Sequence, residues 1–376
     1  MSARRVPFVS LTPGEDASEI HAAIRRVIDR GWFILGPEVD AFEAEFAAAC
    51  GAACAVGVGT GTDAIALVLR ALGIGRGDEV ITTPLSAAFS ALAIMMAGAR
   101  PVFADLDVRR LTLDPRAVEA AVSSRTAAIL PVHLYGQAAD MPALAEVAGR
   151  HGLALIEDCC QAHLATSNGR PVGSYGVAGA FSFYPTKNLG ALGDGGAITT
   201  ADASLADRLK RIRNGGQTDR YHHLEPGVNS RLDEMQAAVL RARLAFLPKW
   251  TARRRQLAAR YRRALVEASV VVPPECDAGH VYHLFPIRAP ERDRLQARLA
   301  AAGIETLIHY PIPIPRQPAL AAEQPLPCPV ADQVCAEILS LPLYPALLES
   351  AVDEVARAVC DLRPLAADRR SPIPDP

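Results

Sequence analysis

Apolar and polar positions along the chain follow two periods. Between residues 79 and 200, short apolar runs typical of buried strands alternate with alanine-rich runs at helical spacing. The predicted strands are residues 80–83, 101–104, 126–131, 153–157, 178–183 and 196–200, and the predicted helices between them are residues 90–97, 114–123 and 141–151. This alternation predicts an α/β fold with a mainly parallel, mixed sheet flanked by helices.

The two ends of the chain differ from this middle part. Before it, helical patterns are expected at 17–30, ending near Gly31, and twice within 41–71, around a turn at 57–62. After Asn229 the pattern predicts helices at 232–246, 250–268 and 292–302, strands at 270–272 and 283–287, and a proline-rich loop at 311–318. We therefore expect an N-terminal segment and large domain over 1–248, a smaller α+β domain over 249–365, and a disordered tail at 366–376.

Composition and charge favour a soluble enzyme. Half of the 376 residues are apolar, 21% are charged, and the formal net charge is −2. This balance gives no reason to expect a nucleic-acid or membrane partner. No apolar run reaches membrane-spanning length, and the first residues lack the apolar core of a signal peptide.

The eight cysteines show no paired CxxC modules, so we expect reduced thiols in a cytoplasmic protein. Cys50 and Cys54 have no second ligand pair, and the adjacent His222 and His223 stand alone. We therefore expect no metal site.

Two adjacent acids, Glu157 and Asp158, stand at the end of the apolar strand at 153–157. Ligands of open α/β sheets bind at the carboxyl ends of strands. A buried carboxylate needs a cationic partner, and a protonated pyridine nitrogen is one such partner. Acids at strand ends also cap helices or bind metals, so position alone leaves these roles open.

Lys187 follows another predicted strand end, in a loop with aromatic residues, a proline and glycines. A free lysine, with a pKa of about 10.4, is a poor nucleophile at neutral pH. Desolvation or a neighbouring cation lowers this pKa and activates the amine. An exposed loop lysine is the alternative.

A glycine-rich turn at 57–62 precedes a predicted helix. Glycines let backbone amides approach an anion, and a helix N-terminus favours negative charge, so the turn is a candidate phosphate site. The alternative is an ordinary helix start capped by Thr62 or Asp63.

Seven segments, taken together and in this order, resemble the DegT/DnrJ/EryC1/StrS family of sugar aminotransferases. They are GWFILGPEV (31–39), GTDA (61–64), PVHLYG (131–136), EDCCQAH (157–163), FSFYPTKNLGALGDGG (181–196), NSRLDE (229–234) and HYP (309–311), and the resemblance runs from about residue 8 to 360. It implies the fold-type I architecture and pyridoxal 5'-phosphate as cofactor.

The resemblance also implies a role for individual residues. Lys187 resembles the Schiff-base lysine, which later carries the proton, and Asp158 resembles the partner of the pyridine nitrogen. The other matched positions are Gln161 near the ring hydroxyl, Gly61, Thr62 and Ser182 at the phosphate, and Tyr184, His309 and Tyr310 at the substrate. Asn229 resembles a residue that reaches the phosphate in the other subunit, which implies a homodimer. A cap on the following helix is its alternative role.

The sequence departs from the family pattern at two places. The usual aromatic residue that stacks on the pyridine ring falls on Ala87, and Phe89 two residues later is the candidate replacement. The second histidine that usually follows HYP falls on Pro315. Both departures concern the substrate side of the site.

The expected reaction moves an amino group from an amino acid, L-glutamate, to a keto-sugar on a nucleoside diphosphate. The run at 187–195 resembles members that act on 3-keto sugars, which indicates a dTDP-3-keto-6-deoxyhexose. A 4-keto sugar is the alternative substrate. Two further alternatives are a dehydratase, in which histidine replaces the lysine, and a non-catalytic, regulatory member of the fold.

Overall fold

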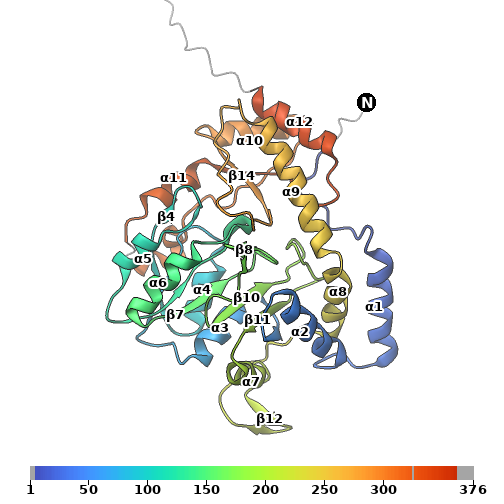
Figure 1. The fold of residues 1–376 in the computed structure, drawn as a ribbon, viewed down its shortest axis with the longest axis vertical. Helices are drawn as coiled ribbons and strands as arrows, with labels where there is room; N and C mark the ends of the chain where they lie inside the picture. Colours follow the sequence, from blue (N-terminus) through green and yellow to red (C-terminus); the bar gives the residue numbers. More distant parts are fainter. Residues whose placement is uncertain (1–4, 324–325, 362–376) are drawn as a thin grey trace, which may run out of the picture.

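The computed structural model describes residues 5–323 and 326–361, and a seven-stranded sheet forms its centre (Figure 1). The order across the sheet is β1-β11-β10-β7-β6-β2-β3. The bounds are β1 (Cys54–Val58), β2 (Glu79–Thr82), β3 (Arg100–Phe103), β6 (Thr126–Leu130), β7 (Ala154–Asp158), β10 (Ala178–Ser182) and β11 (Gly196–Thr200). Strand β11 is antiparallel to both of its neighbours, and the other pairs are parallel. The predicted mainly parallel, mixed sheet is confirmed.

Helices cover both faces of this sheet and pack on it through separate apolar clusters, one on the first face and two on the second. One face packs against α3 (Gly61–Ala71), α4 (Phe89–Met96) and α7 (Ala203–Ile212). The other packs against α2 (Pro37–Ala49), α5 (Pro115–Ala121), α6 (Met141–His151) and α8 (Glu234–Leu244). Helix α1 (Ala17–Arg30) lies against α8 (Figure 1).

Helix α6 shows why several predicted bounds hold. The Asp140 carboxylate accepts a hydrogen bond of 3.3 Å from the Ala143 amide, which satisfies a donor at the helix N-terminus. Gly152 ends the helix in the left-handed region, at φ 64°. Helix α1 ends in the same way at Gly31, at φ 67°.

A second apolar core lies beyond the sheet. It joins α9 (Leu247–Ala264), α10 (Arg292–Ala301), α12 (Glu349–Cys360) and the antiparallel pair β14 (Phe285–Arg288) and β15 (Ile338–Leu341). Val6 also packs here and bridges Ile304, so the start of the chain contacts this part. The predicted border at 248/249 falls within the first turn of α9 and stays a prediction. The predicted tail at 366–376 lies outside the described residues.

Two expected elements differ in the structure. Residues 54–58 form β1, where the sequence predicted the end of a helical pattern and the start of the turn at 57–62, because the whole segment pairs with the distant strand β11. Residues 270–272 form no strand, since only Val271 pairs, in an isolated bridge with Arg288. Both outcomes depend on partners far away in the sequence.

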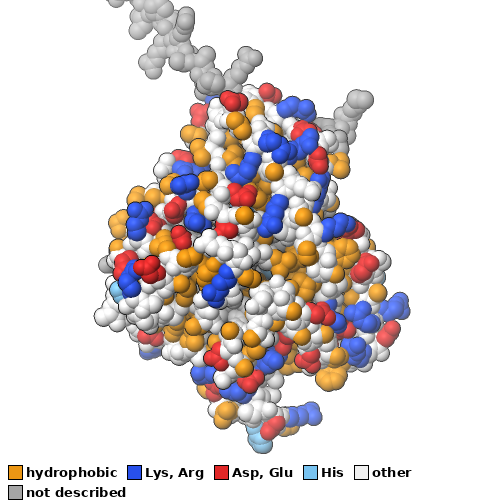
Figure 2. Space-filling model, in the orientation of Figure 1, with side chains coloured by type: hydrophobic (Ala, Val, Ile, Leu, Met, Phe, Trp, Pro, Cys, Tyr) orange, Lys and Arg blue, Asp and Glu red, His pale blue; other side chains and the backbone are white. Residues whose placement is uncertain are grey.

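The remaining elements are short. They are α11 (Pro329–Glu337) and the strand pairs β4 (Leu106–Asp107) with β5 (Thr112–Leu113), β8 (Thr166–Ser167) with β9 (Arg170–Pro171), and β12 (Gln217–Asp219) with β13 (His222–His223). The β12–β13 hairpin extends away from the body of the molecule (Figure 1). Positive and negative side chains are interspersed over the face in Figure 2. Among the described helices none is long and apolar enough to span a membrane.

Candidate active site

The predicted residues meet at one edge of the sheet. Strand β7 ends at Asp158 and β10 ends at Ser182, and these two strands are parallel neighbours. Helix α3 begins at Gly61 directly against the end of β10. The charge of Asp158 acts on the Lys187 amine, which places the lysine at the same edge.

The Asp158 carboxylate is 4% exposed and only partly satisfied by the protein. One oxygen accepts the Ser90 hydroxyl at 2.6 Å, and the other accepts the Cys160 amide at 3.1 Å. Two carboxylate oxygens offer about four acceptor sites, so capacity remains for a donor in the site. Sequence reasoning missed Ser90, which lies on α4, 68 positions before Asp158.

The backbone amides of Gly61 and Thr62 lie at the N-terminus of α3 and form a small anion-binding group, which we call the amide cup. Thr60, rather than Thr62 or Asp63, caps the helix, because its side chain accepts the Asp63 amide at 3.0 Å. This cap leaves the amides of Gly61 and Thr62 available at the positive end of the helix dipole. An anion such as phosphate fits this position.

Gly61 has to be glycine because three elements converge on it. A Cβ there would lie 2.7 Å from the Ser182 Cβ and 2.8 Å from the Cys160 Sγ. The glycine therefore lets the helix end approach the strand ends, and it keeps the amide cup beside the Ser182 hydroxyl.

Lys187 is fixed by a tight loop. Its amide donates to the Tyr184 carbonyl at 2.8 Å, and a Cβ at Gly190 would lie 2.5 Å from the Pro185 carbonyl oxygen. Burial lowers the pKa of the Lys187 amine below its ordinary value, and the nearby Cys160 and Asp158 only partly offset this. A larger share of neutral amine makes Lys187 a better nucleophile.

Three histidines near Lys187, of which His163 and His283 are buried and His309 is half-buried, are held neutral. Burial, reinforced by the positive Lys187, lowers the pKa of His163 to about 3 and that of His309 to about 4. His283 is shifted in the same direction for the same reasons. His283 also lies 3.2 Å from the side-chain oxygen of Asn188, next to the lysine. No local motif pointed to His283, because only the fold brings it here.

Gln161 connects two of the predicted substrate residues. Its side-chain oxygen accepts the Tyr135 amide at 2.8 Å, and its nitrogen donates to the Tyr310 hydroxyl at 3.1 Å. The Tyr135 hydroxyl donates to the His309 carbonyl. Gln161, His309 and Tyr310 thus form one connected wall.

The two departures from the family pattern fall near this wall. Phe89, the candidate replacement for an aromatic residue at position 87, is 62% exposed. The Tyr310 hydroxyl instead interacts with the Ala87 amide. Pro315 is buried within a short 3-10 turn.

Two predicted residues point outward. Tyr184 is 53% exposed, and Asn229 is exposed while its backbone pairs with Asn214. The alternative role of Asn229 as a helix cap is wrong, because α8 begins only at Glu234 and its N-cap is Asp233.

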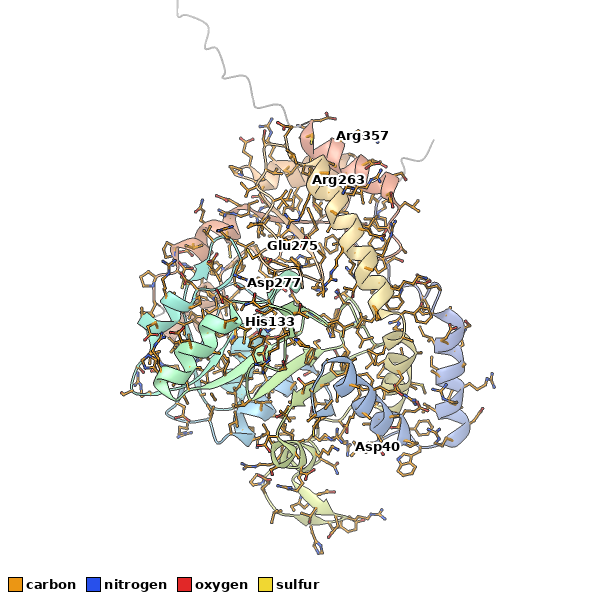
Figure 3. All side chains as sticks on the ribbon, in the orientation of Figure 1. Asp40, His133, Arg263, Glu275, Asp277 and Arg357 are labelled. Carbon is orange, nitrogen blue, oxygen red and sulfur yellow. The ribbon has the colours of Figure 1, made fainter. Side chains whose placement is uncertain are left out.

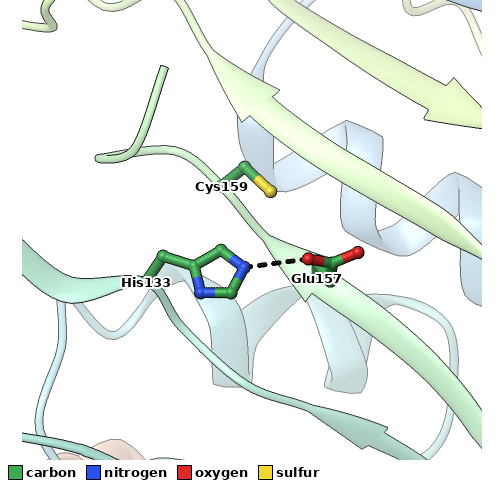
Figure 4. Close-up of side chains that lie close together, drawn as sticks. All are labelled: His133, Glu157 and Cys159. Atoms are coloured by element: carbon green, nitrogen blue, oxygen red, sulfur yellow. Dashed lines mark hydrogen bonds and ion pairs between the residues drawn. The ribbon is translucent and has the colours of Figure 1, made fainter. Parts of the chain in front are cut away.

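Glu157, by contrast, belongs to a buried structural cluster. His133, Glu157 and Cys159 are the group of potential metal ligands found among the described residues (Figure 4). His133, which is labelled in Figure 3, is 0% exposed. His133 Nδ1 accepts the Ala139 amide at 3.0 Å, so Nε2 carries the proton and donates to Glu157 at 3.1 Å. The other donors to Glu157 are the amides of Gly173, Tyr175 and Gly176. The carboxylate is saturated, so this cluster does not need a metal.

The geometry fits pyridoxal 5'-phosphate. A carboxylate with spare capacity suits the ring nitrogen, the amide cup suits the phosphate, and a lysine of lowered pKa suits the aldehyde. The three features come from separate segments that meet at one edge of the sheet.

The comparisons with known proteins give the same result. A family model described as the DegT/DnrJ/EryC1/StrS aminotransferase family matches residues 15–360. The chain belongs to this family. It is therefore a pyridoxal-phosphate-dependent aminotransferase of fold-type I.

Individual relatives cover nearly the whole chain. A dTDP-3-amino-3,4,6-trideoxy-alpha-D-glucose transaminase from Streptomyces venezuelae is 50% identical over 91% of this chain and 92% of its own length. The erythromycin biosynthesis sensory transduction protein EryC1 of Saccharopolyspora erythraea is 49% identical over 93% and 97%. A crystal structure of S. venezuelae DesV, at 49% identity, superposes with a TM-score of 0.92 over 94% of this chain and 97% of that one.

Proposed function

We propose that this aminotransferase moves an amino group from L-glutamate to C3 of a 3-keto-6-deoxyhexose carried on dTDP. The main support is the relative at 50% identity, whose name describes a dTDP-3-amino-sugar transaminase. A nucleotide sugar as substrate and the eight free thiols fit a cytoplasmic reaction. Catalysis is favoured over a regulatory role because the lysine, the carboxylate and the amide cup are all present.

Each residue of the site has a proposed task. When bound, pyridoxal phosphate supplies the carbonyl that takes up the amino group and a ring that accepts the electrons released at carbon. Asp158 keeps the ring nitrogen protonated. Lys187 holds the cofactor covalently and, once free, moves the proton at the amino-bearing carbon through its Nζ.

The remaining predicted residues bind and orient. Gly61, Thr62 and Ser182 hold the phosphate, and Gln161 lies beside the ring hydroxyl. Tyr184, His309 and Tyr310 contact the sugar nucleotide.

We also propose a homodimer in which Asn229 reaches the phosphate bound by the partner subunit. Asn229 is exposed, and the nearby β12–β13 hairpin projects from the body with Tyr221 77% exposed. Leu224 beside it is 69% exposed. Apolar side chains on a projecting element favour burial against another chain.

Product regiochemistry tests the reaction. The enzyme is incubated with L-glutamate and either the 3-keto or the 4-keto nucleotide sugar, and the product is analysed by NMR. We expect turnover of the 3-keto sugar, with the new amine at C3. An amine at C4 refutes the 3-keto assignment, and no turnover with either sugar refutes the nucleotide-sugar substrate.

Subunit mixing tests the shared site. Lys187→Ala and Asn229→Ala chains are allowed to exchange, once the Asn229→Ala homodimer is shown to be impaired. If Asn229 acts on the partner's site, one site of each heterodimer is wholly wild type, and activity returns up to about half per heterodimer. No recovery despite proven exchange, or an active monomer, defeats the shared-site proposal.

A further inference from the structure

A large cavity runs from the catalytic loop to the start of α9. Its volume is about 640 Å³, and its lining includes Lys187 and Asn188 at one end and Arg254 on α9. Leu11 and Trp250 contribute apolar walls. The cavity is large enough to hold a small-molecule substrate.

Arg254 is a buried cation without a carboxylate partner in the described part of the chain. The residue is 5% exposed, and its Nη1 donates to the carbonyls of Tyr282, His283 and Leu343. Its Nε is buried without a hydrogen-bond partner among the described residues. Burial lowers the pKa of Arg254 to about 10. A buried charge of this kind is stabilised by an opposite charge nearby.

The other cations that line the cavity differ from Arg254 in this respect. Arg243 pairs with Asp16 at 2.9 Å, and Lys249 pairs with Glu15. Arg253, the neighbour of Arg254, pairs with Glu349 at 2.8 Å. Apart from the catalytic lysine, Arg254 is thus the cation in this lining that lacks an opposite charge from the described residues. A bound ligand would supply that negative charge.

We propose that the cavity is the amino-donor subsite, in which Arg254 binds a carboxylate of the donor amino acid and of the 2-oxo acid formed from it. The donor's amino group then points toward the Lys187 end of the same cavity. This inference rests on the proposed function, which it extends by assigning a subsite to the donor.

A carboxylate fits this cavity better than the diphosphate of the sugar substrate. One uncompensated cation balances one carboxylate, whereas a diphosphate carries more charge. Lys249 and Arg243 are already paired with Glu15 and Asp16, so the described lining offers a diphosphate no second uncompensated cation outside the catalytic loop. The apolar walls suit the methylene groups of a glutamate-like chain.

Binding of glutarate to the holoenzyme tests the proposal without turnover, because glutarate has no amino group. Isothermal titration calorimetry should show saturable binding that dTDP does not displace. Arg254→Met should weaken it about tenfold or more, as expected for loss of a charge-assisted hydrogen bond. Arg263→Gln, an exposed position on the same helix α9 but outside the lining of the cavity, is the control and should change the affinity less than about twofold. Displacement by dTDP, or unchanged affinity in a folded Arg254→Met enzyme, overturns the proposal.

A second pair of variants covers the case in which Arg254→Met does not fold. Leu11 lines the cavity and is 48% exposed, so it tolerates polar substitution. Leu11→Glu should weaken glutarate binding at least about threefold at low salt, relative to the isosteric Leu11→Gln. Equal affinities for the two variants would overturn the proposal, because glutarate is a dianion and would then bind outside this cavity.

Kinetics separates this proposal from the proposed function. In folded Arg254→Met enzyme the KM for L-glutamate should rise about tenfold or more, while the KM for the keto-sugar changes less than about twofold. Glutarate binding with no turnover of any keto-sugar refutes the sugar substrate and leaves the subsite standing. A KM that rises only for the sugar overturns the subsite.

Discussion

Glu157 and Asp158 are adjacent acids at the end of one strand, yet they have opposite surroundings. Glu157 is 0% exposed and accepts four hydrogen bonds, from the His133 ring and three backbone amides. Asp158 accepts two, from Ser90 and the Cys160 amide, and faces the Lys187 side of the sheet edge. Successive side chains of a strand point to opposite faces, so one position separates the two environments.

The difference shows how to distinguish a structural acid from one available for chemistry. A carboxylate whose acceptor sites are all used holds the backbone in place, and here Glu157 holds the loop at 173–176. A carboxylate with spare acceptor capacity beside a lysine of lowered pKa is available to a ligand. The following changes test this contrast, beginning with the largest expected effect.

Lys187→Ala should reduce transamination by about 10³-fold or more, because in the proposed mechanism this residue provides both the covalent attachment and the proton carrier. Turnover with L-glutamate and the keto-sugar measures the loss, and the absorbance of the bound cofactor should also change. Lys210→Ala, an exposed lysine on α7, is the control and should retain activity. Near-wild-type turnover of the Lys187→Ala enzyme would remove the basis of the site.

Asp158→Asn should lower turnover by about 10²- to 10³-fold, the range typical of losing one electrostatic contact to a charge that develops in the reaction. In the proposed mechanism Asp158 keeps the ring nitrogen protonated, and a neutral amide would not do so. The variant should fold, since Ser90 still has an oxygen acceptor. Steady-state kinetics, with circular dichroism as the folding control, decides the matter, and an unchanged kcat contradicts the assignment.

Glu157→Gln should have the opposite signature and lower the free energy of unfolding by about 3 kcal/mol. The amide nitrogen would face N–H groups that now donate to the carboxylate. The fraction that folds should keep most of its turnover. Thermal and denaturant unfolding measure the loss, and a stable but inactive Glu157→Gln enzyme would break the contrast between the two acids.

Ser90→Ala should give the smallest effect, a decrease in kcat of about tenfold, because the Asp158 carboxylate loses a hydrogen bond that orients it. Ser90→Thr keeps the hydroxyl and should restore most of the rate. A purely structural role would instead lower the melting temperature without a change in kcat, and Thr would then give no kinetic rescue.

Much of the fold follows from local pattern. Helix α6 at Met141–His151 and strand β11 at Gly196–Thr200 have the predicted bounds, because capping residues and apolar runs act over a few residues. Strand β1 was missed, since its glycine-containing sequence resembles a turn and its pairing partner β11 lies far along the chain. The same reason explains why residues 270–272 form only a bridge.

The candidate site divides in the same way. Asp158, Lys187 and the turn before α3 belong to short sequence motifs, so the sequence alone was enough to predict them as site residues. Ser90 and His283 were missed, because they reach the site across 68 and 95 positions of intervening chain. The local spacing of residues in the sequence does not reveal contacts over such distances along the chain.

The sequence by itself determined the chemical types at the sheet edge: a lysine after one strand, a carboxylate at the end of another and glycines before a helix. Those positions follow from short-range patterns of burial and turn formation. Only the tertiary structure decided which of the two adjacent acids is saturated, which hydroxyl holds Asp158, and that Arg254 is buried without a counter-charge in the described chain. Each of these depends on desolvation and on donors that other segments bring, which the chain acquires only when it packs.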